Sequence, residues 1–201
     1  MMNRRTLLAS ALVTLVALPA QAEKLSLDAI SAYLNGLTTA EATFTQINPD
    51  GSGAKGKVII RRPGRMRFEY ERPDKTVVLA SSGQVAIFDA KSNQPPEQYP
   101  LSKTPLNLIL GRRIDLKAAR MVVGHTEEGA LTIVTAQDPA HPEYGMLALG
   151  FSANPVALRQ WVLTDETGGQ TTVLLDKLTE GGNYPPSTFL IDDEMRARGL
   201  N

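Results

Sequence analysis

The stretch "VIIRRPGRMRFEYERPD", residues 58–74, carries five arginines and three acidic residues, yet apolar side chains recur at every second position. Met66, Phe68 and Tyr70 fall on one face of an extended strand. The other face takes the charged residues of the same run, Arg65, Arg67, Glu69 and Glu71. Because successive side chains of a strand point to opposite faces, this alternation predicts an antiparallel strand with one buried and one wet face.

Arg62 has an unusual position in the preceding strand. Val58, Ile60 and Arg62 share one face, so an inward Val58 and Ile60 bring Arg62 inward too. Pro63 favours an extended backbone at Arg62, which preserves this parity. A buried guanidinium needs partners. Either it extends to solvent at the strand end, or it donates to backbone carbonyls at the end of a helix over the sheet, as a link that can break and re-form.

The rest of the chain follows the same pattern of short extended runs separated by turns. We expect strands at 40–47, 57–62, 65–71, 76–80, 84–90, 98–101, 121–125, 131–135, 146–152, 157–164, 171–178 and 188–191. "KLSLDAISAYLNGLT", residues 24–38, predicts a helix capped by Ser26. "KTPLNLILGRR", residues 103–113, predicts a short apolar helix, with Thr104 as cap, Pro105 at the first position and Gly111 at the end. The fold class is therefore mainly β, an antiparallel barrel or strongly curved sheet of about eleven strands with two or three helices on one face.

The N-terminus resembles an export signal. Arg4 and Arg5 precede an apolar run, and "AQA" ends at residue 22, so residues 1–22 predict a cleaved secretory signal peptide and residues 23–201 a single domain. A helical anchor is the alternative, and "NRRTLL" leaves the twin-arginine route open. Cleavage leaves 19 basic against 21 acidic residues, a formal charge of −2 that gives no reason to expect nucleic-acid binding. The chain has no cysteine, which excludes disulfides and thiol catalysis.

The sequence indicates no catalytic or metal site. His125 and His141 lack metal-ligand spacing, and we expect solvated or packing side chains. No serine lies in a nucleophile-elbow context. The acidic run "IDDE", residues 191–194, is typical of a solvated surface, and Trp161 is typical of a core strand. We expect no enzyme activity, no cofactor and no metal.

Several segments, in this order, resemble the LolA family of periplasmic outer-membrane lipoprotein carriers. These are "ATFTQ" (42–46), "GKVIIRRPGRMRFEYERPD" (56–74), "SSGQVAIFDA" (81–90), "PLSKTPLNLILG" (100–111) and "LALGFSANPVALRQWVLTDETGGQTTVLL" (147–175). The "RRPGRMRFEY" and "KTPLNLIL" pair behind a signal peptide is the most specific feature.

The resemblance implies an incomplete barrel whose concave face is covered by helices, with an apolar cavity for the acyl chains of lipoproteins. It implies that Arg62 is a gating residue that binds the backbone at Leu34, Ile109 and Leu110. We expect the cavity wall to contain Val58, Ile60, Met66, Phe68, Tyr70, Phe88 and Leu106. The implied partners are acylated lipoproteins, an inner-membrane lipoprotein-releasing ABC transporter and an outer-membrane receptor lipoprotein, with the carrier itself a monomer in the periplasm.

The chain departs from the family pattern in its aromatic residues. Met66 stands where the family usually has an aromatic, Phe68 where it has a tryptophan, and Ala86 near another frequent tryptophan. A related carrier of another lipid or lipid-linked product is therefore an alternative. A secreted hydrolase and a scaffold with a packed core are further alternatives. Arg65 and Arg67 are expected to be solvated, with partner docking as the other interpretation.

Overall fold

A computed structural model describes residues 24–92, 94–104 and 106–200. The predicted signal peptide and the predicted role of Pro105 lie outside these residues. No helix within the described ranges has the length and apolar character needed to cross a membrane.

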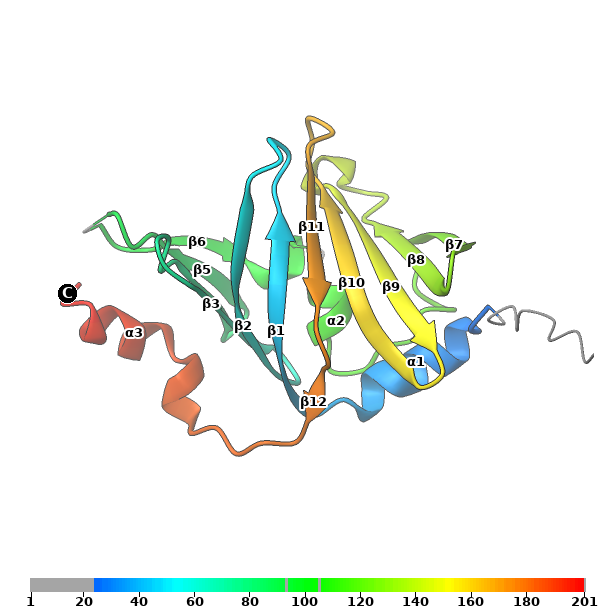
Figure 1. Cartoon of the computed structure of the whole chain (residues 1–201), viewed down its shortest axis with the longest axis horizontal. Helices are drawn as coiled ribbons and strands as arrows, with labels where there is room; N and C mark the ends of the chain where they lie inside the picture. Colours follow the sequence, from blue (N-terminus) through cyan, green and yellow to red (C-terminus); the bar gives the residue numbers. More distant parts are fainter. Residues whose placement is uncertain (1–23, 93, 105, 201) are drawn as a thin grey trace, which may run out of the picture.

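The dominant element is one antiparallel sheet, which contains twelve strands among the described residues. Its order is β6-β5-β4-β3-β2-β1-β11-β10-β9-β8-β7, with β12 paired to β1. Strands β6 and β7 stand at opposite ends of this order, so the sheet is open. Figure 1 shows that it curves strongly. The strands are β1 (Thr39–Ile47), β2 (Gly53–Arg61), β3 (Arg65–Tyr70), β4 (Val77–Ser81), β5 (Gln84–Phe88), β6 (Glu97–Pro100), β7 (Val122–Glu128), β8 (Leu131–Gln137), β9 (Met146–Ala153), β10 (Val156–Thr164), β11 (Gln170–Leu175) and β12 (Thr179–Glu180).

The helices are short. They are α1 (Leu27–Gly36), α2 (Asn107–Leu110) and α3 (Ile191–Ala197), with 3-10 turns η1 (Leu101–Lys103), η2 (Pro142–Tyr144) and η3 (Pro186–Phe189). Ser26 caps α1 as predicted, since its hydroxyl accepts the Ala29 N–H at 3.1 Å. Gly111 ends α2 as predicted. Thr104 does not cap α2, because its hydroxyl donates to the Leu101 carbonyl and ends η1 instead.

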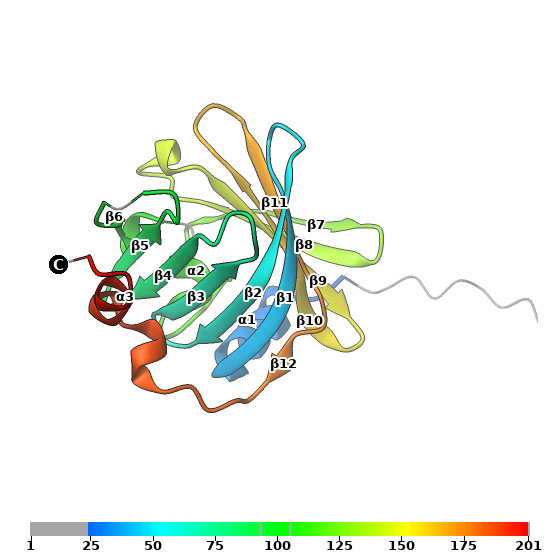
Figure 2. The ribbon, with the colours of Figure 1, turned by 60° about the vertical axis from the view of Figure 1, so that its left-hand side comes forward.

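The sheet has two different faces. Side chains from both halves of the sheet meet those of α1 and α2 in one large apolar core, so this is the concave face. Figure 2 shows α1 and α2 behind the strands, inside the curve, and α3 on the opposite side. The expectation that helices cover the concave face is confirmed for α1 and α2.

Helix α3 covers the convex face, which the sequence did not predict. There, Ile191, Met195 and Leu200 pack on a small cluster of Val77, Leu79, Ala86 and Phe88, which we call the convex cluster. The predicted strand at 188–191 is wrong, because this stretch forms the end of η3 and the start of α3.

Candidate functional site: the concave face and its covering helices

One wall of the concave face comes from β2 and β3. Val58, Ile60 and Met66 are at most 1% exposed, and Phe68 is 7% exposed. Tyr70 packs at the edge of the same core, and its hydroxyl donates to the Gln46 amide oxygen at 2.7 Å. The alternation in residues 58–70 thus places these side chains on the face that the sequence predicted.

The base of this wall is a chain of edge-to-face aromatic contacts. The ring of Phe44 lies 5.1 Å from Tyr70 and 5.4 Å from Phe68, and Phe68 lies 5.8 Å from Trp161 on β10. These contacts join the two halves of the sheet. Trp161 is therefore a core residue, as predicted, and it ends a chain of four aromatic side chains in the concave face.

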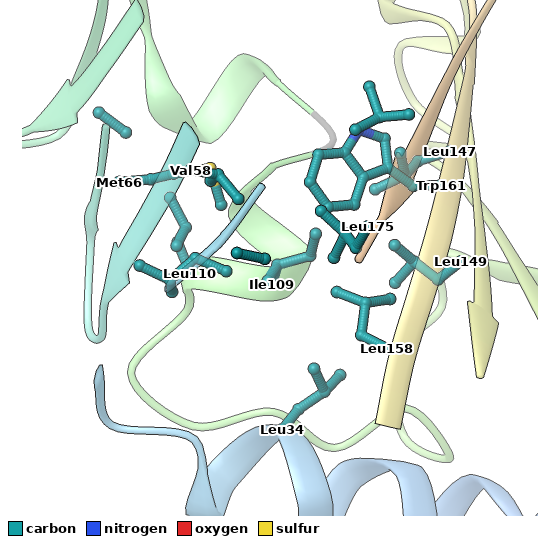
Figure 3. Close-up of a cluster of buried hydrophobic side chains, with 14 of the residues drawn as sticks. Leu34, Val58, Met66, Ile109, Leu110, Leu147, Leu149, Leu158, Trp161 and Leu175 are labelled. Atoms are coloured by element: carbon teal, nitrogen blue, oxygen red, sulfur yellow. The ribbon is translucent and has the colours of Figure 1, made fainter. Parts of the chain in front are cut away.

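The two helices fill the space between the walls. Figure 3 shows Ile109 and Leu110 of α2 between Val58 and Met66 on one side and Leu147, Leu149, Trp161 and Leu175 on the other. Leu34 of α1 points toward Leu158 (Figure 3). Leu34, Ile109 and Leu110 are at most 1% exposed. The concave apolar surface is therefore covered by the chain's own helices in this structure, which is a closed arrangement.

Two residues of the predicted cavity wall lie elsewhere or at the margin. Leu106, which precedes α2, is half-buried against the core. Phe88 belongs to the convex cluster, and its ring lies under the Arg198 guanidinium. The prediction for Phe88 is wrong because Val85, not Phe88, is the residue of β5 that faces the concave core.

Arg62 follows β2 and points toward α2, as its parity predicted. Its Nη2 donates to the carbonyl of Gly111, the residue that ends α2, at 2.6 Å. Its Nε is buried without a hydrogen-bond partner in the described structure. Burial lowers the pKa of this guanidinium. We call the Arg62–Gly111 contact the latch.

The latch differs in detail from what the family resemblance implied. Arg62 donates to the carbonyl of Gly111, where Leu34, Ile109 and Leu110 had been expected as partners. Leu110 does take part through its carbonyl, which accepts the Gly64 N–H at 2.8 Å. The turn between β2 and β3 therefore holds the end of α2 through one side-chain and one backbone hydrogen bond.

Helix α1 is tied to the chain that follows α2. The Asn35 amide donates to the Ile114 carbonyl at 2.7 Å and accepts the Ile114 N–H at 2.9 Å. The Ser31 hydroxyl accepts the Leu116 N–H at 3.0 Å. Sequence reasoning missed both residues, because their partners lie 79 and 85 positions away. The only local signal was a polar side chain on an otherwise apolar helix face.

The charged face of β1–β3 is not simply solvated. Arg67 pairs with Glu69 and, at 2.9 Å, with Glu194 of α3, and both Arg67 and Glu194 expose only 13% of their side chains. Arg61 donates to the Tyr184 carbonyl at 3.0 Å. The predictions of a solvated Arg67 and of a fully solvated "IDDE" run are therefore wrong. These arginines hold residues 181–200, the C-terminal segment, on the convex face.

The two histidines contact a backbone carbonyl and a surface carboxylate. His125 Nε2 contacts the Leu25 carbonyl at 2.8 Å, and His141 Nδ1 contacts exposed Glu143 at 2.9 Å. Within the described ranges, no three His, Cys, Asp or Glu side chains gather in a way that suits a metal ion.

Known proteins with similar sequences include several outer-membrane lipoprotein carrier proteins. The chain is 26% identical over 183 residues to an outer-membrane lipoprotein carrier protein of Cupriavidus necator, with 85% of each chain covered. It is 25% identical over 190 residues to the protein of that name from Chromobacterium violaceum, with 91% and 90% covered. The crystal structure of a putative outer membrane lipoprotein-sorting protein domain from Vibrio parahaemolyticus matches 88% of this chain and 98% of that one, at 8% identity and a TM-score of 0.46.

The family model described as "Outer membrane lipoprotein carrier protein LolA" matches residues 35–192. This match takes in the sheet from β1 to β12, the latch and α2. The chain therefore belongs to the LolA family of outer-membrane lipoprotein carrier proteins.

Proposed function

We propose that this chain is a periplasmic carrier that binds the acyl chains of lipoproteins on its concave face and delivers them to an outer-membrane receptor. The observation that supports it most directly is the closed concave face. A continuous apolar surface is covered by two short helices, α1 and α2, whose apolar side chains fill the space between its walls. In a chain of this family, such helices are suited to give way to a ligand, so a carrier accounts for them better than an enzyme does.

The size of the hydrophobic effect explains why a carrier of this kind needs to open. Each buried methylene contributes about 0.8 kcal/mol, so a lipoprotein with two or three long chains does not leave a membrane unless the carrier offers comparable burial. An empty open face would present a large apolar patch and favour aggregation. Leu34, Ile109 and Leu110 remove that patch in the empty state by occupying the place that we assign to acyl chains.

The free energy of the latch hydrogen bond suits a protein that has to open to bind cargo and close to release it. A hydrogen bond to a charged group contributes about 1.5–3 kcal/mol, and the unsatisfied Nε of Arg62 subtracts from that gain. The closed state is thereby favoured by a small margin that bound acyl chains can exceed. On this proposal, release to the receptor is helped by the return of Arg62 to Gly111.

The proposal includes partners and location. A signal peptide at residues 1–22 would deliver the protein to the periplasm, where an inner-membrane ABC transporter would supply acylated cargo and a receptor lipoprotein would accept it. The carrier would act as a monomer without a cofactor. A related carrier of another lipid or lipid-linked product is the second candidate, since Met66 and Phe68 give a more adaptable wall than a fully aromatic one.

Native mass spectrometry of residues 23–201, purified from a periplasm without detergent, tests the proposal. We expect retained mass that corresponds to a diacylated or triacylated lipoprotein, or binding of an added triacylated lipopeptide. A different co-purifying lipid would favour the second candidate. Failure to bind either class of ligand would contradict a carrier function.

A further inference from the structure

A groove of about 450 Å³ lies outside the concave core, at the end of the sheet where the hairpins β2–β3 and β4–β5 turn. Residues of both turns form one side, including Gly64 and Ser82, and α2 forms the other through Asn107 and Leu110. Leu190, which directly precedes α3, closes a third side. The groove is therefore distinct from the space that we assign to acyl chains, although both touch α2.

The groove is positively charged. Arg65 and Arg112 line it, and no acidic residue does. Both arginines are exposed, and neither forms an ion pair within the described part of the chain. Two other basic residues of this half of the sheet, Lys57 and Arg67, do have carboxylate partners, in Glu41 and Glu194. Two arginines at one groove without a carboxylate indicate an anionic ligand.

The other lining groups suit the neutral part of such a ligand. Leu190, which is 40% exposed, supplies apolar surface, while Leu101 and Leu110 lie buried at the floor of the groove. Ser82 and Gly83 form a two-residue turn with φ values of +50° and +78°, which leaves their N–H groups outside the strand ladder. The groove thus combines two guanidinium groups, a polar turn and an apolar rim.

We propose that this groove binds the phosphodiester headgroup of an anionic phospholipid at a bilayer surface. A guanidinium binds phosphate oxygens in a bidentate manner, and the exposed Leu190 beside the arginines suits the first methylenes below a headgroup. An acidic peptide would use the arginines but would have no need of the exposed Leu190. Both hairpin turns lie at one rim of the sheet, beside the C-terminal segment (Figure 2).

The site goes beyond the proposed carrier function and adds a place for it to be controlled. Gly111, which accepts the latch hydrogen bond from Arg62, also lines the groove. A headgroup in the groove would contact the same short helix that has to move for the concave face to open. This coupling, unlike the headgroup site itself, rests on the proposed function.

Vesicle flotation of residues 23–201 tests the site, with phosphatidylglycerol–phosphatidylcholine vesicles compared against pure phosphatidylcholine. The double variant Arg65→Glu and Arg112→Glu is compared with Lys55→Glu and Arg72→Glu. The control changes net charge equally, but Lys55 and Arg72 line a separate pocket at the other end of β2 and β3. We expect the wild type to float only with anionic vesicles, the groove variant to bind about tenfold more weakly or worse, and the control to stay within about twofold.

Four results would overturn the proposal. Equal losses in both double variants would show a net-charge effect alone, and no flotation of the wild type would show that there is no membrane binding. Binding abolished by inorganic phosphate at millimolar concentration would show a free-anion site. Undiminished flotation of the groove variant together with its loss of binding to an acidic peptide would show a peptide site. Uptake of a lipopeptide by the same variants, measured in parallel, reports on the carrier function separately. Retained uptake with lost flotation would support the groove as an independent site.

Discussion

Arg62 is held near the concave face by a single side-chain hydrogen bond, and this fact determines what its removal should do. The guanidinium contacts the Gly111 carbonyl at 2.6 Å, while its Nε has no hydrogen-bond partner among residues 24–92, 94–104 and 106–200. The pattern of residues 58–63 was enough to predict which side Arg62 faces. It was not enough to predict which carbonyl it binds, because the end of α2 lies 49 positions away.

Replacement of Arg62 by leucine should leave lipopeptide uptake intact and impair transfer to an acceptor. The reason is that the variant lacks the hydrogen bond that favours the closed state over the cargo-bound state. The lost contribution is about 1.5–3 kcal/mol. Uptake and transfer to acceptor protein, measured by fluorescent lipopeptide, check this. Arg72→Leu, at the far end of β3, is the control. Normal transfer by the Arg62 variant would remove the latch from the proposed cycle.

Gly56 on β2 permits the aromatic contacts at the base of the concave face. A Cβ there would lie 2.2 Å from the Glu69 carbonyl oxygen and 2.7 Å from Phe44 Cζ. We expect Gly56→Ala to destabilise the fold by about 1–3 kcal/mol, because backbone and ring have to shift. Urea unfolding measures this. Gly53→Ala on the same strand, whose Cβ would lie 3.6 Å from its nearest neighbour, should be close to neutral. Equal effects would contradict the packing argument.

At the scale of elements, the C-terminal segment is attached to the convex face through a few identifiable groups. Arg67 contacts Glu194 and also donates to the Thr188 carbonyl at 3.3 Å, while Arg198 pairs with Glu194 at 2.7 Å. Nearer its start, Tyr184 donates to Glu41, and burial and this hydrogen bond raise the pKa of Tyr184 to about 12. The segment should therefore detach locally when Arg67 is removed.

Arg67→Ala should increase deuterium uptake of residues 184–200 at neutral pH without affecting β1 or α1. Loss of charged hydrogen bonds worth about 1.5–3 kcal/mol makes local opening at least tenfold more frequent. Hydrogen-exchange mass spectrometry resolves the segment. Arg65→Ala, a neighbour on the same strand without an ion pair, should show the wild-type pattern there. Unchanged protection in the Arg67 variant would mean that the convex cluster alone holds α3.

The attachment should also weaken in acid. Burial of Glu194 opposes its ionisation, but hydrogen bonds from Arg198 and Arg67 outweigh burial, so the pKa is lowered from its usual 4.5. A lowered folded-state pKa means that the stabilisation is present above about pH 4.5 and is lost as pH falls through the folded-state pKa. We expect the NMR methyl signal of Met195, which packs on the convex cluster, to change in that window. Glu194→Gln should abolish this pH-dependent change of the Met195 signal. If the change persists in the variant, another titrating group causes it.

The contrast between β3 and the C-terminal segment shows what the sequence could predict. In β3 the alternation itself specifies the faces, and the observed strand ends within one residue of the expectation. Residues 188–191 were also predicted as a strand, yet they lie in η3 and at the start of α3. There Phe189 is buried, and Arg67 binds the Thr188 carbonyl from 121 positions away. The wrong prediction for Phe88 has the same cause. Because α3 packs on β4 and β5 from the convex side, these two strands bury apolar side chains on both of their faces.

At the scale of the whole molecule, the two covering helices form one unit. Asn35 and Ser31 of α1 hold Ile114 and Leu116, which follow α2, so that α1 and residues 106–116 constitute what we call the lid. The latch holds the lid to one half of the sheet. Tyr33 joins it to the other half, because its hydroxyl accepts the Leu158 N–H at 3.2 Å. Opening the concave face should therefore move both helices together rather than α2 alone.

Asn35→Ala tests this coupling, because it leaves the Ile114 N–H and carbonyl without their partner. The closed state should lose about 1–3 kcal/mol, and the protein without cargo should bind more of a hydrophobic fluorescent dye while taking up lipopeptide faster. Lys117→Ala is a matched control, since Lys117 joins the same two segments through Asp28, but the side chains are 69% and 66% exposed. Such an exposed pair is screened by water and contributes little to stability, so the control should behave as wild type. If Asn35→Ala lowers stability without added dye binding, α1 and α2 open independently, and the latch acts on α2 only.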